Sequence, residues 1–417
     1  MNTIVSHDTP RYRLRSADTW RDPFPMYDEL RADDPVHRVT TRTRRAGDPG
    51  EYWVLTRHAD VWAAANDAAT FSSADGLTVA YGELEAIGMV DNPPLVMQDP
   101  PAHTAFRKLV ARGFTPKQVV DVEPRVRAFV TERLDAIADR RDAPADIVAT
   151  LFKPLPSMVV AHYLGVPEED WPRFDGWTQA IVGATSSGTP TGAGDATAEM
   201  LAYFGELVGF RRSHPGDDTV SALVDAGLAD DPQGLVSILA FAFTMVAGGN
   251  DTTTGMLGGS VELLAAHPAQ RRLLVDDPAR TGPAVEELLR LTSPVQGLAR
   301  TTTRDVDYPD TPRGPVTIPA GRKVLLCYAA ANRDPEKFGP DAAQLRVERE
   351  PRSILTFSHG NHHCLGAAAA RMQSRVALTE LLARFPDFDV DPDGITWAEG
   401  NYVRRPDYVP FYPGARR

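Results

Sequence analysis

With 417 residues, the chain is long enough for one large domain or for two or three smaller ones. Its net charge of −12 at pH 7 argues against a general binder of nucleic acids or anionic membranes, and its two cysteines exclude a disulfide framework and fit a reducing cytoplasm. A hydrophobic content of 42% with 24% charged residues is ordinary for a soluble globular protein.

The start of the chain predicts no targeting segment. Residues 1–20 carry Arg and Asp without an apolar core, so we expect neither a signal peptide nor an anchor there, and residues 1–22 should be irregular. The longest apolar run, Ile238–Ala247, is too short to span a bilayer. We therefore expect a cytoplasmic protein that does not insert into a membrane.

The N-terminal part of the chain predicts two helices, a hairpin and a long loop. Apolar spacing indicates helices at 25–33 and 58–69, with extended segments at 36–40 and 52–56 that can pair. Residues 71–94 are punctuated by Gly and Pro and show no periodicity. Loops of this length are uncommon unless they are functional.

A helix with basic residues is predicted after this loop. Asp99 is a plausible N-cap, with two prolines in the first turn. His103 and Arg107 are four residues apart and share one face, where two donor groups suit a carboxylate; a solvated face is the alternative. Further basic residues follow at Lys108, Arg112 and Lys117. They predict either a docking face for an acidic electron-transfer protein or an ordinary solvated surface.

The middle of the chain is predicted to be helical. Amphipathic periodicity indicates helices at 120–138, 149–164 and 171–182, and a further helix is expected at 196–213. The connection 183–194 is rich in Gly, Ser and Thr and predicts a mobile link. Two helices joined in this way can form a lid over a pocket.

The longest apolar helical stretch, 235–266, predicts a buried central helix with an unusual middle. Two adjacent glycines followed by polar residues cost about 1 kcal/mol per Gly relative to Ala, so a functional reason is expected. Small residues at Ala247 and Gly248 would leave room for a flat cofactor and a diatomic ligand. Thr252 could donate to bound oxygen or to the carbonyl four residues earlier, and Asp251 could relay protons or form a buried salt bridge.

Next, the chain predicts a charged helix followed by strands. Glu287 and Arg290 lie three residues apart in a helix at 283–291, a spacing that is weak evidence by itself. Residues 307–327 alternate and turn like a hairpin, and residues 395–404 look like a closing hairpin. Cys327 lies in an apolar strand and should be an inert core residue.

The other cysteine, Cys364, lies between Gly360 and Gly366 in a loop that leads into a predicted helix at 367–385. The glycines would let the backbone approach a flat partner. Unpaired N–H groups and the positive end of the helix dipole stabilise a thiolate, so we expect a lowered pKa and a soft metal ligand. A structural cysteine is the alternative. A zinc site with the neighbouring histidines is disfavoured because no second thiolate lies nearby.

This loop resembles the haem-binding loop of the cytochrome P450 family, whose pattern is Phe, two residues, Gly, three residues, Cys, one residue, Gly. Phe357, Gly360, Cys364 and Gly366 fit this pattern in full. Ser358 departs from it, because the family most often has Gly there, and we expect the change to affect the turn and not ligation. Five motifs in the family's order extend the resemblance over nearly the whole chain after residue 22.

The resemblance implies a mainly α fold with a small β-rich subdomain, the triangular helical prism of the family, as a single domain over residues 1–417. It implies noncovalent haem b with the Cys364 thiolate as axial ligand, a ligand that pushes electron density onto the iron and favours O–O cleavage. Asp251 and Thr252 would steer proton delivery. The residues assigned to haem binding are His103, Arg107, Ala247, Gly248, Arg300, Phe357, His362, Cys364 and Gly366.

By resemblance, Glu287 and Arg290 form a structural ion pair that ties their helix to the segment before the Cys364 loop. The family commonly completes a triad with an Arg, whose position corresponds here to Gln344. Arg346, Arg349 or a backbone carbonyl could serve instead.

The resemblance also places the loop at 71–94 and the lid around the substrate. The candidates for the substrate pocket are Leu77, Val79, Leu84, Trp177, Ile181, Phe243, Val295, Gln296, Leu298 and Tyr402. Simple loop packing is the alternative for Leu77, Val79 and Leu84. Core packing is the alternative for Trp177 and Ile181.

The implied reaction is NAD(P)H-driven monooxygenation: one atom of O2 enters an apolar small molecule by hydroxylation or epoxidation. Electrons would come from a ferredoxin or flavodoxin and its reductase, and the protein should be a monomer. Two alternatives remain: oxidative coupling or peroxide-driven oxidation on the same scaffold, and a non-catalytic haem sensor or carrier. The sequence leaves the substrate open among sterols, fatty acids, terpenoids and other secondary metabolites.

Overall fold

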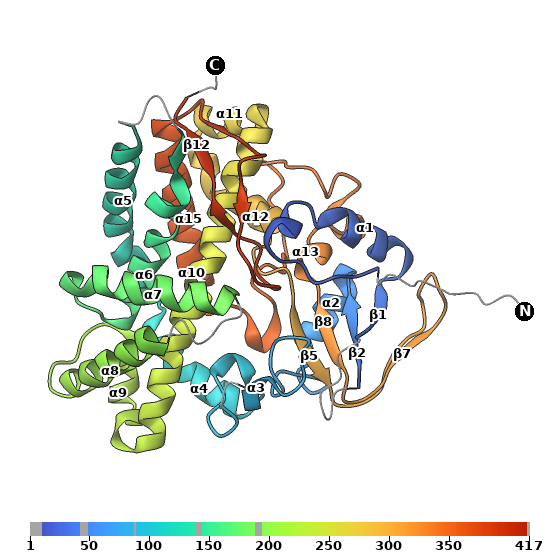
Figure 1. Cartoon of the computed structure of the whole chain (residues 1–417), viewed down its shortest axis with the longest axis horizontal. Helices are drawn as coiled ribbons and strands as arrows, with labels where there is room; N and C mark the ends of the chain where they lie inside the picture. Colours follow the sequence, from blue (N-terminus) through green and yellow to red (C-terminus); the bar gives the residue numbers. More distant parts are fainter. Residues whose placement is uncertain (1–10, 42–48, 87–88, 139–143, 188–193, 415–417) are drawn as a thin grey trace, which may run out of the picture.

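The computed structural model describes residues 11–41, 49–86, 89–138, 144–187 and 194–414. Figure 1 shows a helix-rich region, which contains α5 to α10, beside a region that holds most of the strands together with α1 and α2. The predicted mainly α architecture with a small β-rich part is therefore confirmed.

The helices account for most of the described chain. They are α1 (Phe24–Asp33), α2 (His58–Asn66), α3 (Glu83–Ala86), α4 (Ala102–Val110), α5 (Pro116–Ala138), α6 (Pro154–Leu164), α7 (Trp171–Ser187), α8 (Gly194–Arg211), α9 (Thr219–Asp225), α10 (Pro232–Ala266), α11 (Pro268–Asp276), α12 (Thr281–Thr292), α13 (Tyr328–Ala331), α14 (Pro335–Phe338) and α15 (Ala367–Arg384).

The strands are short and form separate sheets. They are β1 (Val36–Thr40), β2 (Glu51–Leu55), β3 (Phe71–Ser72), β4 (Ala145–Asp146), β5 (Leu298–Thr302), β6 (Val306–Tyr308), β7 (Val316–Ile318), β8 (Lys323–Leu326), β9 (Asp389–Val390), β10 (Thr396–Trp397), β11 (Pro406–Tyr408) and β12 (Pro410–Tyr412). The largest sheet has the order β1-β2-β8-β5-β3, with β2 and β8 parallel and the other pairs antiparallel. A closing hairpin is formed by the pairing of β10 with β11, but its second strand begins at Pro406, beyond the predicted range 395–404.

Helix α10 runs through the helical region and packs against α6, α7, α12 and α15. It begins where the Asp231 carboxylate accepts hydrogen bonds of 2.9 Å from the N–H groups of Gln233 and Gly234. Residues 253–261 are all buried. In the part of the chain that the structure describes, α10 alone has the length and composition of a membrane span, but its contacts are those of a core helix.

Three glycines let the C-terminal segment and α12 pack directly on α10. A Cβ at Gly255 would lie 2.6 Å from the carbonyl oxygen of Arg404, and a Cβ at Gly258 would lie 2.3 Å from Pro406. At Gly259 the same atom would meet Thr292 at 2.8 Å. Because contacts this short do not occur between real Cβ atoms and their neighbours, the close packing of this helix requires glycine.

Most predicted elements are present, with boundaries that move by a few residues. The helix expected at 58–69 ends at Asn66. The amphipathic helix expected at 149–164 is instead a π-helical segment, Val148–Phe152, followed by α6, which is buried almost throughout because α5, α7 and α10 surround it. Helix α7 extends to Ser187, so the predicted link is shorter, and its residues 188–193 lie outside the described part.

Candidate active site

Cys364 lies directly before α15, as the sequence predicts. Its backbone N–H donates to the carbonyl of Phe357 at 2.9 Å, which closes the loop on itself. Gly366 is the N-cap of α15, and a Cβ placed on it would meet nothing within 4 Å. The Cys364 side chain is exposed, and residues 359–366 around it are half-buried or exposed. The cysteine therefore presents an accessible side chain just before the start of a helix.

The prediction of a lowered thiol pKa at Cys364 is wrong for the protein without a bound metal. Burial raises the pKa, and this effect outweighs the Gly366 N–H and the guanidinium groups of Arg107 and Arg371, which lower it. The N–H group at the start of the helix thus lowers the thiol pKa by less than desolvation raises it. A coordinating metal ion would deprotonate the thiol outright.

Ser358 holds a backbone conformation that favours glycine. Its φ is 56°, in the left-handed region, and its hydroxyl accepts a hydrogen bond of 3.1 Å from the buried Tyr328 hydroxyl. The left-handed conformation costs a non-glycine residue about 1–2 kcal/mol. The side-chain hydrogen bond therefore offsets part of the cost of having serine where the resembling loops have glycine.

We predict that Ser358→Gly changes the free energy of unfolding by less than about 1 kcal/mol, because relief of backbone strain and loss of the Tyr328 partner oppose each other. In a Tyr328→Phe background that partner no longer matters, so the same substitution should stabilise the protein by about 1 kcal/mol. Urea unfolding of the four proteins measures both effects. Equal effects in the two backgrounds would contradict this interpretation.

Gly360 has a different neighbour from the one predicted. Its φ is 67°, and a Cβ would lie 2.6 Å from the carbonyl oxygen of Ala65 at the end of α2. The absence of a side chain at this position thus allows the loop to pack on α2. His359 also packs on α2, because its ring stacks on that of Trp62 with centroids 3.5 Å apart.

A cluster of cationic and donor groups surrounds the loop. His103 on α4 and His362 have ring centroids 4.2 Å apart, and the Arg107 Nη2 donates to the carbonyl of His363 at 2.5 Å. Arg300 on β5 is also buried near His362. Burial first, and Arg300 second, lower the pKa of His362 to about 3, and burial with Arg107 lowers that of His103. The cluster combines two arginines with two histidine rings and therefore suits an anion.

His103 supplies the clearest sign of a missing ligand. The residue is 1% exposed, yet both of its ring nitrogens lack a hydrogen-bond partner. Buried polar groups are nearly always hydrogen-bonded in folded proteins.

The predicted N-cap, Asp99, does not cap helix α4. Its carboxylate accepts hydrogen bonds from the Ser73 N–H and the Ser72 hydroxyl, at 2.9 and 2.5 Å, and the cap position is Pro101.

The middle of α10 presents small and polar groups. A Cβ at Gly248 would meet nothing within 4 Å, so this turn of the helix also faces open space. The Thr252 hydroxyl donates to the Gly248 carbonyl at 3.0 Å, which confirms the predicted bond to the residue four positions earlier. The Asp251 carboxylate pairs with Arg405 at 2.7 Å, the buried salt bridge left open above. The partner Arg405 is not predicted by the sequence.

Glu287 and Arg290 form the predicted ion pair, with both side chains fully buried and a bidentate contact of 2.8 Å. Arg349 completes it, with its Nε 3.1 Å from the Glu287 carboxylate. The Arg346 backbone N–H also donates to this carboxylate, while its side chain pairs with Asp341 outside. Arg290 additionally donates to the carbonyls of Asn332 and Ala342, so each of the three open alternatives contributes.

The candidates for the substrate pocket fall into two groups. Leu77 is joined to β5, because its carbonyl accepts from the Ala299 N–H, and Val79 is joined to Tyr402, whose hydroxyl accepts from the Val79 N–H. Leu84 is buried in α3, while Val295 pairs with Val403 and Leu298 begins β5. Trp177, Ile181 and Phe243 belong to a separate apolar cluster, to which α4, α6, α7, α8, α9 and α10 contribute.

Two candidates make contacts typical of core residues. Gln296 is 3% exposed; its amide donates to the Ser293 carbonyl, and its side-chain oxygen accepts from Tyr27, so its placement at the substrate is wrong. Trp177 is 5% exposed and donates its indole N–H to Glu199, which favours the core alternative. Only tertiary packing shows that these two residues lie in the core, because Gln and Trp can equally line a substrate pocket.

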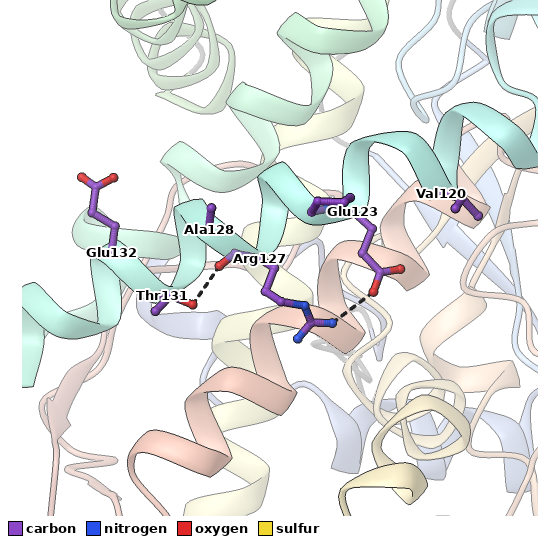
Figure 2. Close-up of a pocket in the computed structure, with 7 residues that line it drawn as sticks. Val120, Glu123, Arg127, Ala128, Thr131 and Glu132 are labelled. Carbon is purple, nitrogen blue, oxygen red and sulfur yellow. Dashed lines mark hydrogen bonds and ion pairs between the residues drawn. The ribbon is translucent and has the colours of Figure 1, made fainter.

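A surface hollow of 610 Å³ lies elsewhere, along one face of α5. Figure 2 shows that its lining side chains come from this single helix, with Arg127 paired to Glu123. It contains none of the predicted site residues. The candidate site therefore remains the region of the Cys364 loop, the unpartnered His103 and the open turn of α10 at Gly248.

Comparisons with known proteins agree with this geometry. The family model described as Cytochrome P450 matches residues 281–397. The chain is 64% identical to Cytochrome P450 130 of Mycobacterium tuberculosis over 99% of both chains. The chain belongs to the cytochrome P450 family. It is also 37% identical to Mycinamicin IV hydroxylase/epoxidase of Micromonospora griseorubida, covering 92% of this chain and 94% of that protein.

Solved structures of cytochromes P450 have the same fold. The LnmA cytochrome P450 hydroxylase from the leinamycin biosynthetic pathway of Streptomyces atroolivaceus superimposes with a TM-score of 0.79 at 34% identity, covering 94% of this chain and 96% of that one. As a P450, the chain is a monooxygenase that uses haem iron with a cysteine ligand, O2 and reducing equivalents. The described residues fit haem, because Cys364, the unpartnered His103 and the open face at Gly248 supply a thiolate, propionate donors and room.

Proposed function

We propose that Cys364 is the axial thiolate of haem b and that the protein hydroxylates or epoxidises an apolar secondary metabolite. For hydroxylation, R–H, O2, NAD(P)H and H⁺ would give R–OH, NAD(P)⁺ and water. Bound haem supplies O2 activation at its iron, favoured by the thiolate. The observation that carries the proposal is buried His103, whose two ring nitrogens lack a hydrogen-bond partner, beside His362 in the loop that carries the exposed Cys364.

The chain's own residues would hold the cofactor by its carboxylates. His103, Arg107, Arg300 and His362 supply donors at one edge of the site, and His103 has both ring nitrogens free to bind. Phe357 shields the loop, with the Arg371 guanidinium 4.5 Å from its ring centroid. A Cβ at Gly248 would meet nothing within 4 Å, so the turn of α10 that holds Ala247 and Gly248 would leave room for the cofactor. Leu77, Val79, Leu84, Phe243, Val295, Leu298 and Tyr402 are retained as candidates around the substrate.

Electrons would come from NAD(P)H through a ferredoxin or flavodoxin with its reductase. The protein would accept them in the cytoplasm, as a monomer with a single domain. The exposed side chains of Lys108 and Arg112 extend the basic character of α4 beyond Arg107, while Lys117 is paired with Asp121. A basic face near the thiolate loop suits an acidic redox partner and would raise the association rate. Association that slows steeply with salt would support this arrangement.

The test of the haem proposal is spectroscopic. The purified protein, reduced and exposed to carbon monoxide, is expected to show the strongly red-shifted Soret band of a thiolate ligand. Product formation that requires NADPH, O2 and a reconstituted redox chain would then exclude a haem carrier. Comparable turnover with peroxide alone would instead favour the peroxide-driven alternative. Absence of the shifted band in folded, haem-loaded protein would overturn the proposal.

We predict that Thr252→Ala lowers the product formed per NADPH on the order of tenfold and raises hydrogen peroxide correspondingly, because the variant lacks a hydroxyl to support proton delivery. The hydroxyl donates to Gly248, and its oxygen lone pairs remain able to accept a hydrogen bond. Thr252→Ser keeps the hydroxyl and should retain coupling. Tightly coupled turnover in Thr252→Ala would contradict the role given to this residue.

A further inference from the structure

The buried partner of Asp251 is an arginine from the C-terminal strand region. Arg405 Nε lies 2.7 Å from the Asp251 Oδ1, and the two side chains are 5% and 17% exposed. Breaking such a pair leaves an uncompensated charge inside the protein. The contact therefore fixes where the Asp251 carboxylate can lie.

Arg405 is itself held from a second side. Its Nη1 lies 2.7 Å from the Asp407 Oδ1, and Lys153 Nζ approaches the same oxygen at 3.1 Å. The Asp407 side chain is 49% exposed, so this part of the ion-pair network lies at the surface. A planar guanidinium bound by two carboxylates has one fixed orientation. Because Asp407 holds Arg405 independently, the arginine stays compensated when Asp251 takes up a proton.

The backbone is shaped for this contact. Gly255 lies one turn after Asp251, and a Cβ there would lie 2.6 Å from the Arg404 carbonyl oxygen and 3.4 Å from the Cβ of Arg405. The adjacent Arg404 turns elsewhere, because its Nε donates to the Trp20 carbonyl and its guanidinium covers the Trp397 ring. Of the two neighbouring arginines, Arg405 is thus directed at Asp251.

We propose that Arg405 is a positioning residue for proton delivery, which orients the Asp251 carboxylate beside Thr252 while allowing it to exchange protons. The inference rests on the proposed function, since it presupposes that Asp251 delivers protons during O2 reduction. It assigns no chemical step to Arg405 itself. Its prediction is that Arg405 affects turnover only through Asp251.

The experiment is a double-substitution cycle in the haem-loaded, full-length protein with a reconstituted redox chain. The proteins are wild type, Arg405→Gln, Asp251→Asn and the double variant. We expect Arg405→Gln to lower product per NADPH on the order of tenfold and to raise the solvent deuterium isotope effect, with an unchanged carbon monoxide spectrum. The double variant should be no worse than Asp251→Asn alone. Arg405→Lys, which keeps one charged contact, should restore part of the loss.

Lys153→Gln serves as the matched control, because it removes only the outermost contact of this network and should leave coupling within twofold of wild type. Effects of Arg405→Gln and Asp251→Asn that multiply in the double variant would overturn the inference. Unchanged coupling in Asp251→Asn would overturn the proton role in the proposed function instead. If Arg405→Gln does not retain haem, Arg405→Lys in both Asp251 backgrounds carries the same test.

Discussion

Replacement of Cys364 with histidine is expected to abolish monooxygenation while the fold is retained. Histidine can bind haem iron, but a neutral imidazole does not push electron density onto the iron as a thiolate does. The reduced, carbon monoxide-bound protein should lose the red-shifted Soret band, and product formation should fall to background. Both changes are measured on the same preparation, with circular dichroism to establish folding.

Cys327 provides the control for this substitution. Its side chain is 1% exposed, and burial raises the pKa of its thiol to about 12, as expected of an inert core residue. Cys327→Ala should therefore keep the shifted band and full turnover per haem. Full hydroxylation by Cys364→His would contradict the assignment of the ligand.

The second large effect is expected at the buried ion pair. Arg290→Met leaves the Glu287 carboxylate at zero exposure with Arg349 as its remaining charged side-chain partner. Breaking a buried pair from one side typically costs about 3–5 kcal/mol. We expect a loss of this size in urea unfolding, together with poor haem retention, because Arg290 also holds the carbonyls of Asn332 and Ala342.

Arg346 offers a matched arginine beside the same carboxylate. Its side chain is 57% exposed and pairs with Asp341, while its contact with Glu287 uses the backbone N–H. Arg346→Gln should change stability by no more than about 0.5 kcal/mol. If both substitutions cost the same, the ion pair does not carry the stabilisation that we assign to it.

Local sequence was sufficient for the parts of the site that lie within one element. The loop pattern around Cys364, the glycines within α10 and the i, i+3 spacing of Glu287 and Arg290 each specify neighbours a few residues apart. Thr252 illustrates this, because its bond to Gly248 is a consequence of helix geometry alone. The boundaries of α10 and α15 followed from the same periodicity.

The partners of these residues were not predictable in the same way. Arg405, the partner of Asp251, lies in a different segment far along the chain. Arg349 completes the Glu287–Arg290 ion pair only because its segment folds back onto α12. Gln296 and Trp177 show the same limit, since a residue type cannot tell a pocket wall from a core. The thiol pKa of Cys364 depended on desolvation, which is a property of the packed molecule.

By itself, the sequence determined the mainly helical architecture, the cysteine loop and the glycine-containing middle of the central helix. Hydrophobic period, glycine placement and short spacing are properties of local backbone geometry. The tertiary structure decided which charges compensate Asp251 and Glu287 and why Gly255 and Gly360 must be glycine. Those outcomes depend on contacts between segments distant in the chain, and such contacts leave no periodic trace in the sequence.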